Sequence, residues 1–193
     1  MTEFGTPICL SSSDENKVRI FRPNEVVAIL QLGIPKLEYR TMFEALLYSG
    51  ARYVEMQTFH ENPGWLEGSF IHFPRSAQKK VKQKIKERWV RLNPQGLKVC
   101  EYFLKGKPLP IRQAWREDLH RWCKDAKVSE EGLSVKCLRK TWESFLMFYY
   151  PQNAIQICLS QGHTQATSLE YYLNLPFNEQ ERREMKQFVD GWI

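Results

Sequence analysis

The chain has 193 residues, of which 42% are hydrophobic and 26% are charged. These values are typical of one folded globular domain, and they argue against a fibrous or largely disordered protein. Lys and Arg outnumber Asp and Glu by 28 to 22, which gives a formal net charge of +6. This modest excess permits a nucleic-acid partner but does not require one.

Nothing in the sequence indicates a membrane span, a metal site or a set of disulfide bonds. There is no run of eighteen apolar residues, and the polar N-terminus lacks the apolar stretch of a signal peptide. The five cysteines are scattered and form no C-x-x-C pair, so neither zinc binding nor a disulfide framework is supported. No cluster of Asp and Glu suited to Mg²⁺ is apparent. We therefore expect a reduced, cytoplasmic protein that uses no cofactor.

The N-terminal part predicts a leader followed by two helices. Residues 1–20 are polar and are expected to form a flexible leader or the end of a linker. A first helix is expected to begin near Pro23, a residue suited to a first helical turn. Apolar residues recur at helical spacing from Leu37 to Ser49, which predicts a second helix that ends at Gly50.

A short sheet is expected in the middle of the chain. Residues 65–73 are aromatic and β-branched, and residues 88–92 have the composition of a partner strand. The connector between them, residues 78–87, is very basic. From Asn93 onward the apolar spacing is helical, so the predicted fold is mainly α with a small antiparallel β-sheet. We expect one domain over residues 21–177, followed by an amphipathic tail helix over residues 178–193.

Four short segments carry side chains suited to chemistry, and each has a simpler structural explanation. Arg52 follows Gly50 and precedes Glu55, a spacing that also suits an ordinary surface ion pair. Lys136 and Arg139 lie three residues apart, which is also typical of a solvated basic helix face. His163 follows a glycine, as capping or core histidines do. Tyr171 and Tyr172 lie in an apolar stretch, where tyrosines usually pack.

Together, the four segments resemble the conserved boxes of tyrosine recombinases in order, spacing and predicted secondary structure. The Gly-x-Arg-x-x-Glu pattern around Arg52 resembles the first arginine box of that family. Lys136-x-x-Arg139 resembles the His-x-x-Arg box, and Gly162-His163 with Tyr172 nine residues later resembles the last box. The resemblance covers roughly residues 22–175. Four ordered boxes in one chain favour a shared function over four coincidences.

The resemblance implies the tyrosine recombinase catalytic-domain fold and metal-independent exchange of DNA phosphodiesters. Tyr172 is expected to attack the phosphate and form a 3′-phosphotyrosine, which conserves the bond energy without ATP. Arg52 and Arg139 are expected to hold the phosphate oxygens, since guanidiniums stay charged and bind oxygens in pairs. His163 would donate a hydrogen bond to a phosphate oxygen, and Lys86 would protonate the leaving oxygen.

Two choices of residue remain open at this level. Any of five lysines in the connector could be the acid, and spacing alone does not decide between them: Lys79, Lys80, Lys82, Lys84 and Lys86. Lys86 is preferred on the resemblance to archaeal-type integrases, in which the catalytic Lys tends to lie just before the aromatic third strand, here at Trp89. Tyr171 and Tyr172 differ by about 100° on a helix, so both cannot face the phosphate. The nine-residue step from His163 is the usual spacing in the family that the chain resembles, and it favours Tyr172.

Lys136 departs from the family pattern, because a histidine usually occupies this position. The change resembles integrases of archaeal viruses and plasmids, and it leaves the acceptor of the Tyr172 proton undefined. The resemblance also implies double-stranded DNA as the partner and self-association on DNA as a dimer or tetramer. The usual N-terminal DNA-clamping domain is not evident, so we expect an excised catalytic domain or a minimal enzyme. The alternatives are a type IB topoisomerase and a DNA-binding protein without catalysis.

Overall fold

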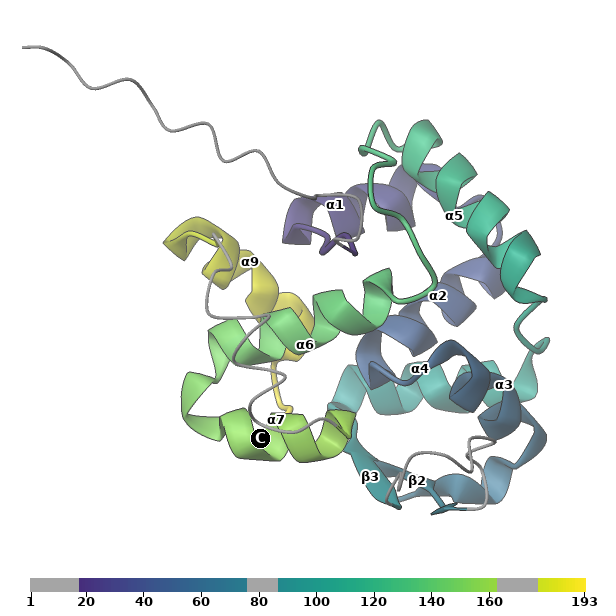
Figure 1. The fold of residues 1–193 in the computed structure, drawn as a ribbon, viewed down its shortest axis with the longest axis vertical. Coiled ribbons are helices and arrows are strands. Elements are labelled where there is room, and N and C mark those ends of the chain that lie inside the picture. Colours follow the sequence, from purple (N-terminus) through teal and green to yellow (C-terminus); the bar gives the residue numbers. More distant parts are fainter. Residues whose placement is uncertain (1–17, 76–86, 163–176) are drawn as a thin grey trace, which may run out of the picture.

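The computed structural model describes residues 18–75, 87–162 and 177–193, which form packed helices with a small sheet at one edge (Figure 1). The expected mainly α fold with a small antiparallel sheet is confirmed. The helices of the described residues are α1 (Pro23–Ala28), α2 (Leu37–Ser49), α3 (Tyr53–Glu61), α4 (Pro94–Lys105), α5 (Arg112–Asp125), α6 (Cys137–Tyr149), α7 (Ala154–Gln161) and α9 (Glu179–Val189). None of them is long and apolar enough to cross a bilayer.

The N-terminal helix begins as its sequence predicts and then changes geometry. Pro23 occupies the first turn of α1, and the Glu25 side chain accepts a hydrogen bond from the Arg22 N–H at 2.8 Å. The helix continues into the π-helical turn η2 (Ile29–Gly33). A Cβ atom on Gly33 would lie 2.4 Å from the carbonyl oxygen of Trp122. Glycine is therefore required here for the close approach of η2 to α5.

Helix α2 spans the residues that its apolar spacing predicts, and it packs against both α4 and α6 (Figure 1). It ends at Gly50, which has a φ of 55° and donates its N–H to the carbonyls of Leu46 and Leu47. Such a left-handed residue ends a helix and turns the chain sharply. The turn brings Arg52 to the N-terminus of α3, next to the beginning of the sheet region.

The sheet consists of β1 (Leu66–Glu67), β2 (Phe70–Phe73) and β3 (Arg88–Arg91), in antiparallel order β1-β2-β3. A short 3-10 turn, η3 (Pro63–Trp65), leads into β1, and a second one, η5 (Pro151–Asn153), joins α6 to α7. The register pairs Phe73 with Arg88 and His72 with Trp89. Because side chains alternate along a strand, Arg88 and Val90 share the buried face of β3.

Helix α9 packs in the same core as the rest of the domain, against α1 and α6. Its apolar residues Met185, Phe188 and Val189 are almost completely buried, as is Trp192, which follows the helix. The Trp192 indole N–H donates to the Arg91 carbonyl at 3.1 Å, and Arg22 pairs with Glu181 at 2.6 Å. The C-terminal stripe is therefore buried by its own chain in this structure. The four described cysteines are free and buried, as their scattered spacing predicts.

Candidate functional site

Arg52 is fixed by a carboxylate one turn into the following helix. It is the N-cap residue of α3, and its backbone N–H donates to Glu55 Oε2 at 2.7 Å. Its guanidinium Nη1 donates to Glu55 Oε1, also at 2.7 Å. The Arg52 side chain is still 38% exposed, so one side of the guanidinium is available to a ligand. A Glu at the third helical position also stabilises the start of α3, because its carboxylate accepts a hydrogen bond from a backbone N–H that has no partner within the helix.

Glu55 is not half of an ordinary surface pair, because its side chain is only 6% exposed. Its Oε2 atom also accepts a hydrogen bond from Arg88 Nη2 at 2.6 Å. Burial alone would raise the pKa of Glu55, but the nearby Arg88 and Arg52 guanidiniums and the hydrogen bonds from Arg52 lower it below its ordinary value. The carboxylate is therefore charged at neutral pH and serves two arginines at once.

Arg88 belongs to this cluster, although the sequence indicated only a strand residue there. Its side chain is 4% exposed and lies over the Phe73 ring, 5.0 Å from the centroid. Besides Glu55, it donates from Nη1 to the Gln161 carbonyl at 3.1 Å. Burial lowers the pKa of Arg88 to about 9, against the opposing effect of Glu55, so the guanidinium is charged at neutral pH.

Arg139 points inward from the first turn of α6 and is 7% exposed. Its Nη1 donates to the Gly50 carbonyl at 2.6 Å, and its Nη2 donates to the Gln161 carbonyl. These carbonyls lie at the C-terminal ends of α2 and α7, where the helix dipoles concentrate negative charge. Leu138 and Trp142 face the core as expected. The alternative of a solvated basic helix face is wrong for Arg139, because the ends of two helices enclose it.

Lys136 is placed differently from Arg139. It is the N-cap residue of α6 and is exposed, whereas Arg139 is buried. The two cations therefore differ in their access to solvent. The remaining expected site residues, Lys86, His163 and Tyr172, lie outside the described residues, as does Tyr171. Glu87 and Gly162, which adjoin Lys86 and His163 in the chain, are described.

Three of the four motif segments meet in space within the described residues. The first arginine box contributes Arg52 and Glu55, the second contributes Arg139, and the last contributes Gln161 and Gly162. Gly162 has a φ of 67° and ends α7 directly before His163. Arg88 links the first and last of these segments from β3. The result is a cluster of three guanidiniums and one buried carboxylate, which favours an anionic ligand.

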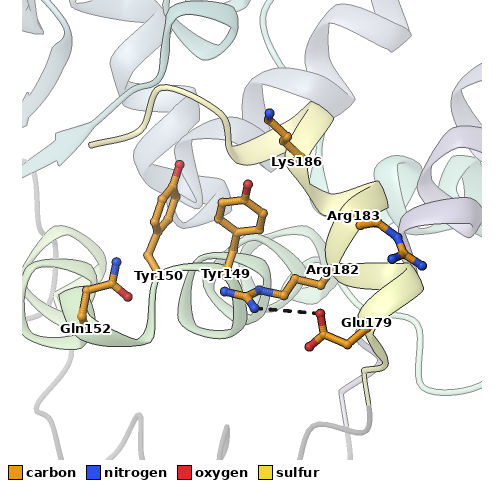
Figure 2. A pocket seen from close by; sticks show the side chains of 7 residues that line it. All are labelled: Tyr149, Tyr150, Gln152, Glu179, Arg182, Arg183 and Lys186. Carbon is orange, nitrogen blue, oxygen red and sulfur yellow. Dashed lines mark ion pairs between the residues drawn. The ribbon is translucent and has the colours of Figure 1, made fainter.

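A separate hollow lies between the end of α6 and the face of α9 (Figure 2). Its volume is about 620 Å³. Arg182 lies 5.8 Å from the Tyr149 ring centroid and 3.9 Å from Glu179, whereas Arg183 is directed away from the two tyrosine rings. Tyr149 lies ten residues beyond Arg139 on α6, which is a rise of roughly 15 Å along the helix. The hollow is therefore not part of the arginine cluster.

Comparison with known proteins finds a likeness in structure but none in sequence. No family model matches the chain, and no curated protein matches it in sequence. The crystal structure of XerA recombinase is similar with a TM-score of 0.62 and 15% identity, over 89% of this chain and 65% of that one. XerH site-specific recombinase, bound to its difH substrate in a pre-cleavage complex, is similar with a TM-score of 0.56 and 15% identity. That likeness covers 100% of this chain and 58% of the XerH chain.

The described fold is thus the mainly helical, small-sheet fold of tyrosine recombinase catalytic domains. The sequence motifs and the structural likeness agree on this class of fold, although they rest on different observations. The chain spans less than two thirds of the length of either similar recombinase.

Proposed function

We propose that this chain is the catalytic domain of a tyrosine recombinase, which cuts and rejoins double-stranded DNA at specific sites. The observation that carries the proposal is that Arg52 and Arg139 are both linked to the segment that immediately precedes His163. Arg139 donates to the Gln161 carbonyl directly, and Arg52 is connected to that carbonyl through Glu55 and Arg88. The two arginines are far apart in sequence, and the fold joins them in one network. A protein that only bound DNA would have no need for charges fixed in this way.

In the proposed reaction, the Tyr172 oxygen attacks the scissile phosphorus and forms a P–O bond, and the phenolic proton passes to solvent water. The bond from phosphorus to the 5′ oxygen breaks, and that oxygen takes a proton from Lys86. The reverse attack by a 5′ hydroxyl on the phosphotyrosine rejoins a strand and releases Tyr172. Because one phosphodiester-type bond replaces another at each step, no external energy source is needed.

Arg52 and Arg139 are proposed to stabilise the extra negative charge on the phosphate oxygens during attack. Fixed cations lower the barrier more than mobile ones, because they need no reorganisation when the charge develops. The hydrogen bonds to Glu55, Gly50 and Gln161 supply this fixation. His163 and Lys136 would complete the contacts to phosphate. The exposed position of Lys136 supports a contact with incoming DNA.

Lys136 also supports a narrower assignment, to the integrases of archaeal viruses and plasmids, which act on DNA in the host cytoplasm. The proposed reaction is then integration and excision. A type IB topoisomerase would use the same chemistry but would relax supercoils without joining two sites. Measuring relaxation of a supercoiled plasmid against strand exchange between two sites distinguishes these two enzymes.

The proposed assembly is a dimer or tetramer that forms on DNA through the C-terminal helix. In this structure α9 packs on its own domain, so exchange between subunits would require the contacts of Trp192 and Met185 to break and form again on a neighbour. Light scattering with and without target DNA tests the proposal. A monomer that stays monomeric on DNA would contradict it.

The decisive test of catalysis is a covalent adduct. The protein is incubated with nicked suicide DNA, and an SDS-resistant protein–DNA complex is sought on a denaturing gel. Tyr172→Phe should abolish the adduct and leave DNA affinity nearly unchanged, because only the attacking oxygen is lost. Tyr171→Phe is the matched control and should still form it. Absence of the adduct with intact protein would leave DNA binding without catalysis as the function.

A further inference from the structure

The geometry points to Arg88 as a positioning residue that holds Arg52 and Arg139 in a fixed relation to one another. This inference rests on the proposed function, because it concerns the two arginines of that site. Arg88 touches the partner of Arg52 on one side and the partner of Arg139 on the other. It is thus the one described side chain seen to bridge both arginine positions.

Stability alone does not account for a charged residue at this position in β3. The Arg88 side chain faces the core with Val90, whereas Trp89 and Arg91 face outward. An inward-facing strand position normally holds an apolar residue, and burying a charge is costly. A well-packed apolar pair is often as stable as a buried ion pair. A role in arranging its neighbours explains the charge better.

Arg88 reaches Arg52 through a shared carboxylate. Glu55 Oε1 accepts from Arg52 Nη1, and Glu55 Oε2 accepts from both the Arg52 backbone and Arg88 Nη2. The Glu55 side chain is buried and cannot exchange these partners for water freely. Arg88 therefore fixes the plane of the carboxylate, and the carboxylate fixes the Arg52 guanidinium, which is the more exposed of the two.

Arg88 reaches Arg139 through a shared backbone oxygen. The Gln161 carbonyl accepts hydrogen bonds from Arg88 Nη1 and from Arg139 Nη2. Arg139 holds the Gly50 carbonyl with its other terminal nitrogen. Removing Arg88 leaves Arg139 and the end of α7 without this common support. The expected result is a displaced guanidinium in an otherwise folded domain.

Because Arg88 is 4% exposed and both of its Nη atoms are bonded, it does not contact the phosphate itself. Its loss should therefore slow the chemical step and leave DNA affinity unchanged. A misplacement of about 1 Å in a catalytic group can cost roughly 10²-fold in rate. Three measurements on each variant separate these effects: the free energy of unfolding, the Kd for uncleaved DNA, and the single-turnover rate of adduct formation at saturating DNA.

The variants are Arg88→Met, Arg88→Lys and the matched control Arg91→Met. Arg91 lies on the same strand but faces outward, over the Phe70 ring. We expect Arg88→Met to form the adduct about 10²-fold more slowly with a Kd within about twofold of the unaltered protein. Arg88→Lys keeps a cation beside Glu55 but lacks the planar fork that spans two acceptors. Arg88→Lys should have a higher free energy of unfolding than Arg88→Met, but it should still form the adduct at least about tenfold more slowly than the unaltered protein. Arg91→Met should cleave at the normal saturating rate.

Arg88→Met leaves Glu55 buried without its main partner and could fail to fold. The double variant Arg88→Met/Glu55→Gln removes both charges together and decides the question in that case. It is expected to fold and to cleave slowly. A folded double variant or Arg88→Lys protein that cleaves within about threefold of normal would overturn the positioning role. If the unaltered protein forms no adduct on any DNA, the proposed function fails instead, so the two failures are distinct.

Discussion

Arg88 fills the space that Gly162 leaves by having no side chain. A Cβ atom at residue 162 would lie 3.0 Å from Arg88 Cδ and 3.1 Å from Arg88 Nη1, and φ there is 67°. Gly162→Ala should therefore suffer both backbone strain and crowding against a buried guanidinium. Strain alone costs roughly 1–2 kcal/mol. Denaturant unfolding should show a larger loss than this, together with slower adduct formation.

The control for that substitution is Gly68→Ala. Gly68 has a φ of 58°, but no atom lies within 4 Å of its ideal Cβ position. It therefore reports the backbone strain without the crowding. Equal losses of unfolding free energy for the two variants would contradict this expectation, because they would show that the Arg88 side chain moves away from the added methyl group without loss of stability.

Glu55 should make the domain sensitive to acid. Its pKa is lowered in the folded state, so it contributes stability above its unfolded pKa of about 4.3. That contribution is lost as pH falls through the lower folded pKa. Glu55→Gln should be less stable than the unaltered protein at neutral pH, because Arg88 loses its charged partner. The difference in unfolding free energy between the two proteins should become smaller toward pH 3. Urea unfolding across this range measures the difference, and exposed Glu131→Gln should follow the unaltered protein throughout.

Arg52 and Arg139 should both affect the rate of cleavage, but only Arg139 should clearly affect the stability of the domain. Arg52→Ala and Arg139→Ala should each slow adduct formation by a factor on the order of 10² or more, since each removes preorganised charge. Only Arg139→Ala should also reduce stability clearly, because its buried guanidinium satisfies the carbonyls of Gly50 and Gln161. Arg183→Ala, on the exposed side of α9, is the control. Near-normal cleavage by either site variant would sink the proposed mechanism.

Lys86 is tested by changing the leaving group. A 5′-bridging sulfur needs little protonation, so a missing acid matters less with this substrate. Lys86→Ala should be slow on normal DNA and close to normal on the sulfur substrate. The same assay on Lys84→Ala and Lys80→Ala reports whether another lysine is the acid. A variant slow on both substrates would act through phosphate contact instead.

Trp192 should contribute more to stability than its place near the end of the sequence suggests. It is 2% exposed and donates a hydrogen bond to the Arg91 carbonyl. Trp192→Ala should lose about 3–5 kcal/mol of unfolding free energy, the usual cost of removing a buried large aromatic side chain. The adjacent Ile193 is 55% exposed, and Ile193→Ala should stay within about 0.5 kcal/mol. Similar losses for both would contradict the packing of α9 in its own core.

Local patterns predicted the elements of the fold well, because they depend on neighbours in sequence. The apolar spacing of α2 and its left-handed stop at Gly50 are both short-range effects, and both are confirmed. The expected pairing of the segment 65–73 with the segment 88–92 is confirmed for residues 70–73 and 88–91. Residues 66–67 form a separate strand that pairs with 70–71, which the expected single strand did not include. The π-helical turn at Ile29–Gly33 was not predicted; Gly33 lies there against the Trp122 carbonyl of α5, a residue distant in sequence.

The site was harder to predict, because its key contacts use backbone atoms. Arg139 binds the carbonyls of Gly50 and Gln161, and a carbonyl has no signature in the sequence. Arg88 could have been noticed: it shares the inward face of β3 with Val90, and a charge on that face needs a buried partner. The stripe of α9 predicted an apolar helix face, but the spacing alone could not say which chain would cover it.

The ion pair between Arg22 and Glu181 joins residues 159 positions apart, and α9 completes the core beside α1 and α6. During synthesis on the ribosome, the first helix therefore has to wait for nearly the whole domain before its contacts are complete. Nascent chains halted before residue 178 should expose apolar surface on α1 and α6 and be cut readily by protease. Chains halted well beyond residue 193 should resist cutting by protease. The domain thus matures late and as one unit, after the residues of the proposed site have already been synthesised.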